Sequence, residues 1–145
     1  MTAIINRPVT DSANNVAAGA APTDSLLRFA LRADATVCGG LGLFVAMAAD
    51  PLSELSGLSP TSEWIGGAAL VVYGGLLYML AGIHHVGRVG IGVLAGNIAF
   101  AALVAVVLVA GWLPLTELGV VSMIAFTVVT LACAYAQYLG VRRLA

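Results

Sequence analysis

The residues that could do chemistry are few, and they stand inside long apolar runs. Asp34, Tyr78, Asn97 and Gln137 each interrupt a stretch of mostly aliphatic residues. Polar side chains inside a membrane are costly, so they usually bind a ligand or one another. We predict that these four side chains form one polar cluster. The alternatives are a headgroup-hydrated carboxylate for Asp34 and a simple hydrogen bond between helices for Asn97.

Motifs for metal binding and covalent catalysis are absent from the sequence. His84 and His85 are adjacent, whereas haem ligands normally come from separate helices. Cys38 and Cys133 lie in apolar runs, which is typical of inert buried thiols. The chain has no CxxC, HExxH or nucleophile-elbow pattern. We therefore expect a non-enzymatic protein without metal or cofactor.

Composition indicates which elements position the polar residues. Apolar residues make up 61% of the 145 residues and charged residues 9%, whereas soluble domains are about half apolar and a quarter charged. The apolar segments lie at about 29–49, 64–83, 91–111 and 118–139. Each can span a hydrocarbon core about 30 Å thick as a helix, the form that satisfies its own backbone in lipid. The predicted fold is an all-α integral membrane four-helix bundle.

The rest of the chain divides into a tail and short connections. Residues 1–24 are rich in Ala, Asn and Thr without apolar periodicity, which predicts a disordered cytoplasmic tail. Residues 25–145 are predicted to form the four-helix transmembrane domain. The connections 50–63, 84–90 and 112–117 read as loops or turns, short enough to make neighbouring helices antiparallel.

Arginine positions predict the orientation in the membrane. All the arginines precede the first segment, separate the second from the third, or follow the fourth: Arg7, Arg28, Arg32, Arg88, Arg142 and Arg143. The other two connections carry acids only. The positive-inside rule then places both termini in the cytoplasm and the polar cluster in the inner leaflet of the plasma membrane. By depth, Arg88 or Arg142 is the expected charge partner of Asp34.

Glycines recur with helical spacing in the first three segments. The candidate helix-packing residues are Gly39, Gly42, Gly67, Gly74, Gly75, Gly82, Gly92 and Gly96. Small residues at such spacing let neighbouring helices approach closely. We expect these contacts within the bundle. The alternative is that one glycine seam faces outward and binds a second copy or another membrane protein.

The layout of the four apolar segments resembles that of a group of known proteins. With LLRFALRADA at the start of the first segment and LAGN in the third, it is similar to small uncharacterised four-helix transmembrane proteins of actinobacteria, mycobacteria especially. The resemblance covers the helices and not the tail. It implies a plasma-membrane location and transfers no functional residue.

Two functions follow as hypotheses. The preferred one is a scaffold or accessory protein that binds a membrane or exported cell-envelope partner, because glycine seams are abundant and catalytic motifs are lacking. The alternative is a small transporter or channel with a polar inner-leaflet site around Asp34. Membrane lipid is the expected environment in either case. With a net charge of −1, the chain has no basic face that suggests nucleic acid.

Overall fold

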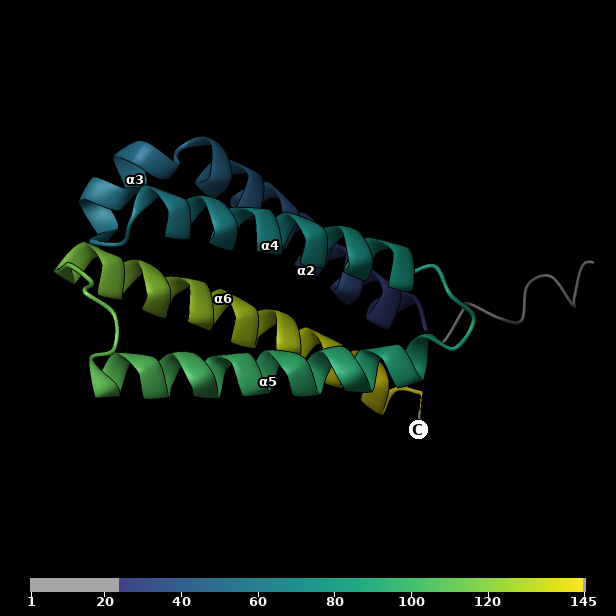
Figure 1. Ribbon diagram of the computed structural model, residues 1–145. Helices are drawn as coiled ribbons and strands as arrows, with labels where there is room; N and C mark the ends of the chain where they lie inside the picture. The colour runs from purple at the N-terminus through teal and green to yellow at the C-terminus, as the bar shows by residue number, and fades with distance from the viewer. Residues whose placement is uncertain (1–23, 145) are drawn as a thin grey trace, which may run out of the picture.

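The computed structural model describes residues 24–144, which form helices and no strands (Figure 1). The helices are α2 (Ser25–Met47), α3 (Ala49–Ser56), α4 (Pro60–Leu80), α5 (Val86–Ala110) and α6 (Glu117–Arg142). Four of them, all except α3, are long and apolar enough to cross a membrane. The prediction of an all-α bundle with four spans is therefore confirmed. The predicted tail lies outside the described residues, except for Asp24.

The connection between the first two spans was predicted wrongly. Residues 50–63 read as a loop, but α3 occupies much of this range and α4 already begins at Pro60. The Ser59 side chain accepts a hydrogen bond from the Ser62 N–H at 3.1 Å, which makes Ser59 the N-cap of α4. Proline fits the next position because the N–H that it lacks has no helical partner there. The Ser-Pro pair is thus a helix start.

The other two connections are short. α5 begins at Val86, so the turn predicted over 84–90 ends earlier than expected. α5 ends before Gly111, whose φ of 63° is left-handed. The Thr116 side chain caps α6 by accepting the Gly119 N–H at 3.0 Å. The same residue donates its backbone N–H to the Ser56 carbonyl at 2.9 Å, which ties this connection to α3.

Helix α2 makes most of the contacts that hold the bundle together. It packs most extensively against α4 and then against α6, whereas α5 packs chiefly against α6 and only lightly against α2. In Figure 1 the α2–α4 pair and the α5–α6 pair form two separate layers. The bundle can therefore be described as two helix pairs joined along α2 and α6.

Glycine allows the close approach of α2 and α4. A Cβ on Gly67 would lie 2.6 Å from the Gly42 carbonyl oxygen, and a Cβ on Gly74 would lie 2.7 Å from the Ala35 carbonyl oxygen. Real side chains do not reach such distances, so the two backbones touch directly. Gly140 plays the same part between α6 and α2, since its Cβ would lie 2.8 Å from the Leu27 Cα.

Gly39 also belongs to the α2–α4 contact through its backbone, because a Cβ on Gly74 would lie 2.7 Å from the Gly39 N. A Cβ added to Gly39 itself, or to any of the remaining predicted helix-packing glycines, would not meet a neighbouring helix. Nothing lies within 4 Å of a Cβ built on any of four of them: Gly39, Gly75, Gly92 and Gly96. A Cβ on Gly82 would meet only the Met79 carbonyl of its own turn, at 3.3 Å. The reason is rotation, because adjacent glycines on α4 point about 100° apart and only one of them can face α2.

Charge separates the two ends of the bundle. The start of α2, the α4–α5 connection and the end of α6 lie together at one end in Figure 1. The described arginines all belong to this end: Arg28, Arg32, Arg88, Arg142 and Arg143. The opposite end carries acids, and the helix surfaces between the ends expose large apolar side chains such as Val72 (63%) and Val128 (59%). The chain is thus a multi-pass membrane protein whose sides contact lipid.

Candidate functional site

Asp34 lies on the face of α2 that is turned into the bundle. It continues the buried stripe formed by Leu27, Ala30 and Leu31, and its exposed fraction is 2%. It stands nine residues into α2, or about 14 Å along the helix axis. The side chain is therefore enclosed by protein within the span and is not hydrated at the headgroups.

Two amides from two other helices donate to the same oxygen of this carboxyl group. The Gln137 Nε2 of α6 lies 2.7 Å from the Asp34 Oδ2, and the Asn97 Nδ2 of α5 lies 3.1 Å from it. The Asn97 Nδ2 also donates to the Gln137 Oε1 at 3.2 Å. The structure thus brings together three of the four residues that the sequence placed at one depth.

The tyrosine of the cluster is Tyr73 and not Tyr78. The Tyr73 hydroxyl of α4 donates to the Asn97 Oδ1 at 3.2 Å, whereas Tyr78 is 61% exposed on the outer surface. Five residues apart on one helix, the two side chains point about 140° away from each other. Tyr73 lies on the side of α4 that is turned toward α5, so it reaches the cluster and Tyr78 does not.

Cys38 completes the contacts of Asp34. Its thiol lies 3.4 Å from the Asp34 Oδ1, one helical turn further along α2. The sequence contained this signal, because residues four apart share a helix face. We define the polar cluster by its hydrogen-bonded members, which come from all four spans: Asp34, Cys38, Tyr73, Asn97 and Gln137.

No basic side chain pairs with Asp34 among residues 24–144. The one ion pair in that range joins Arg28 to Asp24 at 2.8 Å. Arg88 and Arg142, which the sequence suggested as partners, are exposed at the end of the bundle. The carboxyl group is instead surrounded by three neutral donors, the arrangement that an acceptor-only carboxylate needs.

Other residues with metal-binding or redox chemistry form no hydrogen bond with the cluster among the described residues. His84 and His85 are exposed in the connection between α4 and α5. Cys133 is half-buried on α6 and unpaired. The part of the chain that the structure describes holds no group of three or more His, Cys, Asp or Glu side chains arranged for a metal ion.

Comparisons with known proteins give this site no precedent. None of the protein-family models, curated proteins or solved structures compared with the chain matches it. The chemistry of the polar cluster must therefore be argued from its own geometry.

That geometry favours reversible binding at Asp34 over covalent chemistry. A carboxylate with two oxygens can take up a proton or a small cation, and the amides beside it can present either N–H or carbonyl groups. Every buried polar side-chain atom of the described residues has a hydrogen-bond partner. Each cluster residue belongs to this one hydrogen-bonded network, so a change at Asp34 alters hydrogen bonds that involve all four spans.

Proposed function

We propose that this protein is a small membrane transporter in which Asp34 binds the transported or coupling cation, either a proton or a small monovalent metal ion. One observation carries the proposal: a carboxyl group is buried inside the span, hydrogen-bonded to other helices, and has no cationic partner among the described residues. Ionisable residues in membrane spans are expensive, face the bundle interior, and mark substrate and ion pathways.

The cluster also links Asp34 to helix arrangement. Among the described residues, Asn97 supplies the side-chain hydrogen bonds that tie α5 to α2 and α4. A proton or cation on the Asp34 Oδ2 competes with the two amides that donate to this oxygen. Binding would weaken the tie between the α2–α4 pair and the α5–α6 pair, which lets the pairs move and expose the site.

The proposed location is the plasma membrane, with both termini cytoplasmic. It rests on the arginines, none of which lies in the connections 50–63 and 112–117, because basic residues remain on the cytoplasmic side. Single cysteines introduced at Ser56 and Arg7 in a cysteine-free background test the orientation. An impermeant maleimide added outside should label the first and not the second; the reverse pattern would invert the proposal.

Flux through proteoliposomes tests the transport proposal. Vesicles holding the wild type and a pH-sensitive or metal-sensitive dye receive an inward gradient of protons, Na⁺ or K⁺. Asp34→Asn keeps the size of the side chain and removes its charge, so the flux of one of these ions should fall about tenfold or more. Asp50→Asn, at the exposed start of α3, is the matched control and should stay within about twofold of the wild type.

Two results would overturn this function. One is wild-type flux in Asp34→Asn, and the other is no flux of any of the three ions in the wild type. In either case the polar cluster would serve the assembly of the helices rather than ion passage.

An accessory role remains a second candidate because of one feature of α5. Gly92 and Gly96 face outward, with open space where a side chain would stand, so a further membrane helix could approach there. A membrane or exported envelope partner should then co-purify in mild detergent and be lost in Gly96→Leu. Gly75→Leu, an open glycine on α4, is the control. A protein that stays partnerless in several mild detergents would contradict this role.

A further inference from the structure

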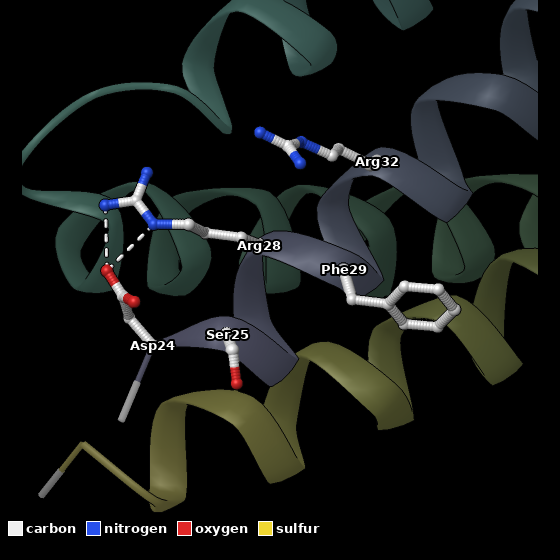
Figure 2. Close-up of a pocket in the computed structure, with 5 residues that line it drawn as sticks. All are labelled: Asp24, Ser25, Arg28, Phe29 and Arg32. Atoms are coloured by element: carbon white, nitrogen blue, oxygen red, sulfur yellow. Dashed lines mark hydrogen bonds and ion pairs between the residues drawn. The ribbon is translucent and has the colours of Figure 1, made fainter. Parts of the chain in front are cut away.

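A second charged feature lies outside the polar cluster, on the opposite face of α2. An open cavity of about 430 Å³ at the start of this helix is lined by Asp24, Ser25, Arg28, Phe29 and Arg32 (Figure 2). It belongs to the end of the bundle where the arginines gather. The transport proposal makes no use of it.

The two arginines of the cavity differ in their partners. The Arg28 Nε lies 2.8 Å from the Asp24 Oδ2, and its Nη1 donates to the Ala81 carbonyl at 2.7 Å, which closes the end of α4. The guanidinium of Arg32 forms no ion pair within residues 24–144. Figure 2 shows both side chains extending toward the same side of α2. The cavity therefore carries one net positive charge, and Arg32 supplies it.

Depth distinguishes Arg32 from a surface arginine. Arg28 marks the level at which α4 ends, because it binds the Ala81 carbonyl there. Arg32 stands four residues further into the span, about 6 Å deeper along α2. Its long side chain can reach back toward the headgroups. The phosphate of a membrane lipid resides at the same depth and is the anion that a guanidinium at this boundary meets.

The surface of α2 beyond Arg32 suits an acyl chain. Phe29 is 70% exposed beside the cavity and offers an apolar side to lipid. Gly40 lies on the same face as Phe29, about three turns deeper along α2, and a Cβ built on it would meet nothing within 4 Å. The face therefore offers a cationic group at the boundary and, below it, a strip of small residues formed by Ala33, Thr36 and Gly40.

We propose that this face binds one anionic glycerophospholipid, with its phosphate held by Arg32 at the cavity and with an acyl chain along the strip from Phe29 to Gly40. Arginine suits this role because its planar guanidinium binds phosphate oxygens in pairs. Basic sites beside membrane helices recognise lipid headgroups in the same way.

The amount of anionic lipid that stays bound to the released protein tests this site directly. The wild type is reconstituted in nanodiscs of mixed phosphatidylcholine and phosphatidylglycerol, then released and weighed with its bound lipids by native mass spectrometry. Phosphatidylglycerol should stay bound to the wild type in preference to phosphatidylcholine. Arg32→Gln should reduce the bound phosphatidylglycerol about fivefold. Arg143→Gln, at the end of α6, removes the same charge outside the cavity and should leave retention unchanged.

A second variant tests the contribution of the acyl-chain strip separately from that of the arginine charge. Gly40→Leu keeps every arginine but fills the strip, so it should also lower retention. Inorganic phosphate added in detergent should not displace the lipid, because the site needs the chain as well as the phosphate. Wild-type retention in both Arg32→Gln and Gly40→Leu would overturn the proposal, as would equal losses in Arg32→Gln and Arg143→Gln. Displacement by free phosphate would show an anion site rather than a lipid site.

Discussion

The α2–α4 pair and the attachment of α5 are built from different interactions. Between α2 and α4, glycines remove the side chains and the two backbones meet, with Gly67 and Gly74 facing the carbonyls of Gly42 and Ala35. Helix α5 has no such backbone contact with α2: its Gly90 meets the side chain of Leu27 near the end of the bundle, and at mid-span the side chain of Asn97 joins the two helices by a hydrogen bond. At mid-span the first interface depends on shape, whereas the second depends on the state of Asp34. A protein that changes shape on binding a cation would be expected to do so at the second.

The largest effect should come from the backbone contact. Gly74→Leu forces a side chain against the backbone of α2, and overpacking of this kind typically costs about 1–3 kcal/mol, more where backbone must move. We expect a loss of about 3 kcal/mol or a failure to assemble, measured by SDS unfolding in mixed micelles. Gly75→Leu is the control one residue away, where nothing lies within 4 Å of a Cβ. Equal stability of the two variants would mean that α2 and α4 do not touch there.

The next effect concerns the attachment of α5. Asn97→Leu removes the donor to the Asp34 Oδ2 and the acceptor for the Tyr73 hydroxyl, which leaves buried polar groups unpaired. Such a loss costs about 1–3 kcal/mol. A cysteine pair across α2 and α5 should form a crosslink more slowly in this variant, while a pair across α2 and α4 should react as before. Slowing of both pairs would show that the two interfaces are coupled.

A smaller effect distinguishes the two tyrosines. Tyr73→Phe removes one hydroxyl that donates at 3.2 Å, and hydrogen bonds between membrane helices contribute about 0.6 kcal/mol on average. Tyr78→Phe removes a hydroxyl on the outer surface and should leave the free energy of unfolding unchanged. The same unfolding assay checks both. If Tyr78→Phe is the more damaging of the two, the rotation of α4 described above is wrong.

The sequence predicted depth well and rotation poorly. Asp34, Asn97 and Gln137 were grouped because a fixed rise per residue converts position along a helix into depth, and the structure places them in hydrogen-bond contact. Tyr78 was chosen by the same rule, but depth does not say which way a side chain points. Rotation depends on which face a neighbouring helix covers. Because apolar residues surround the whole of α4, its sequence does not indicate which face is turned inward.

The glycines show the same limit. In the second segment Gly67 and Gly74 are seven residues apart, and so are Gly75 and Gly82. Spacing alone cannot say which of these two pairs meets α2. The contact of Gly140 with Leu27 was missed because a lone glycine carries no repeat. Helix α3 was missed because its serines and prolines resemble a loop, although Ser59 and Pro60 also fit the start of the next helix. Helix starts and loops share residues, so composition alone does not separate them.

The smallest expected effect tests whether the outer face of α5 belongs to the bundle. Gly96→Leu adds a side chain where nothing lies within 4 Å, so the stability of the isolated protein should fall by no more than about 0.5 kcal/mol. Gly90→Leu on the same helix is the matched control, because its Cβ would already lie 2.8 Å from Leu27 and 3.1 Å from Val141. That variant should unfold at a clearly lower SDS concentration than the wild type.

A loss of about 1 kcal/mol or more in Gly96→Leu, seen only at high protein concentration, would show instead that this face is covered by a second copy, since a self-association contact weakens with dilution. A loss independent of concentration would mean that α5 is turned differently about its axis, and Asn97 could then not reach Asp34 as described.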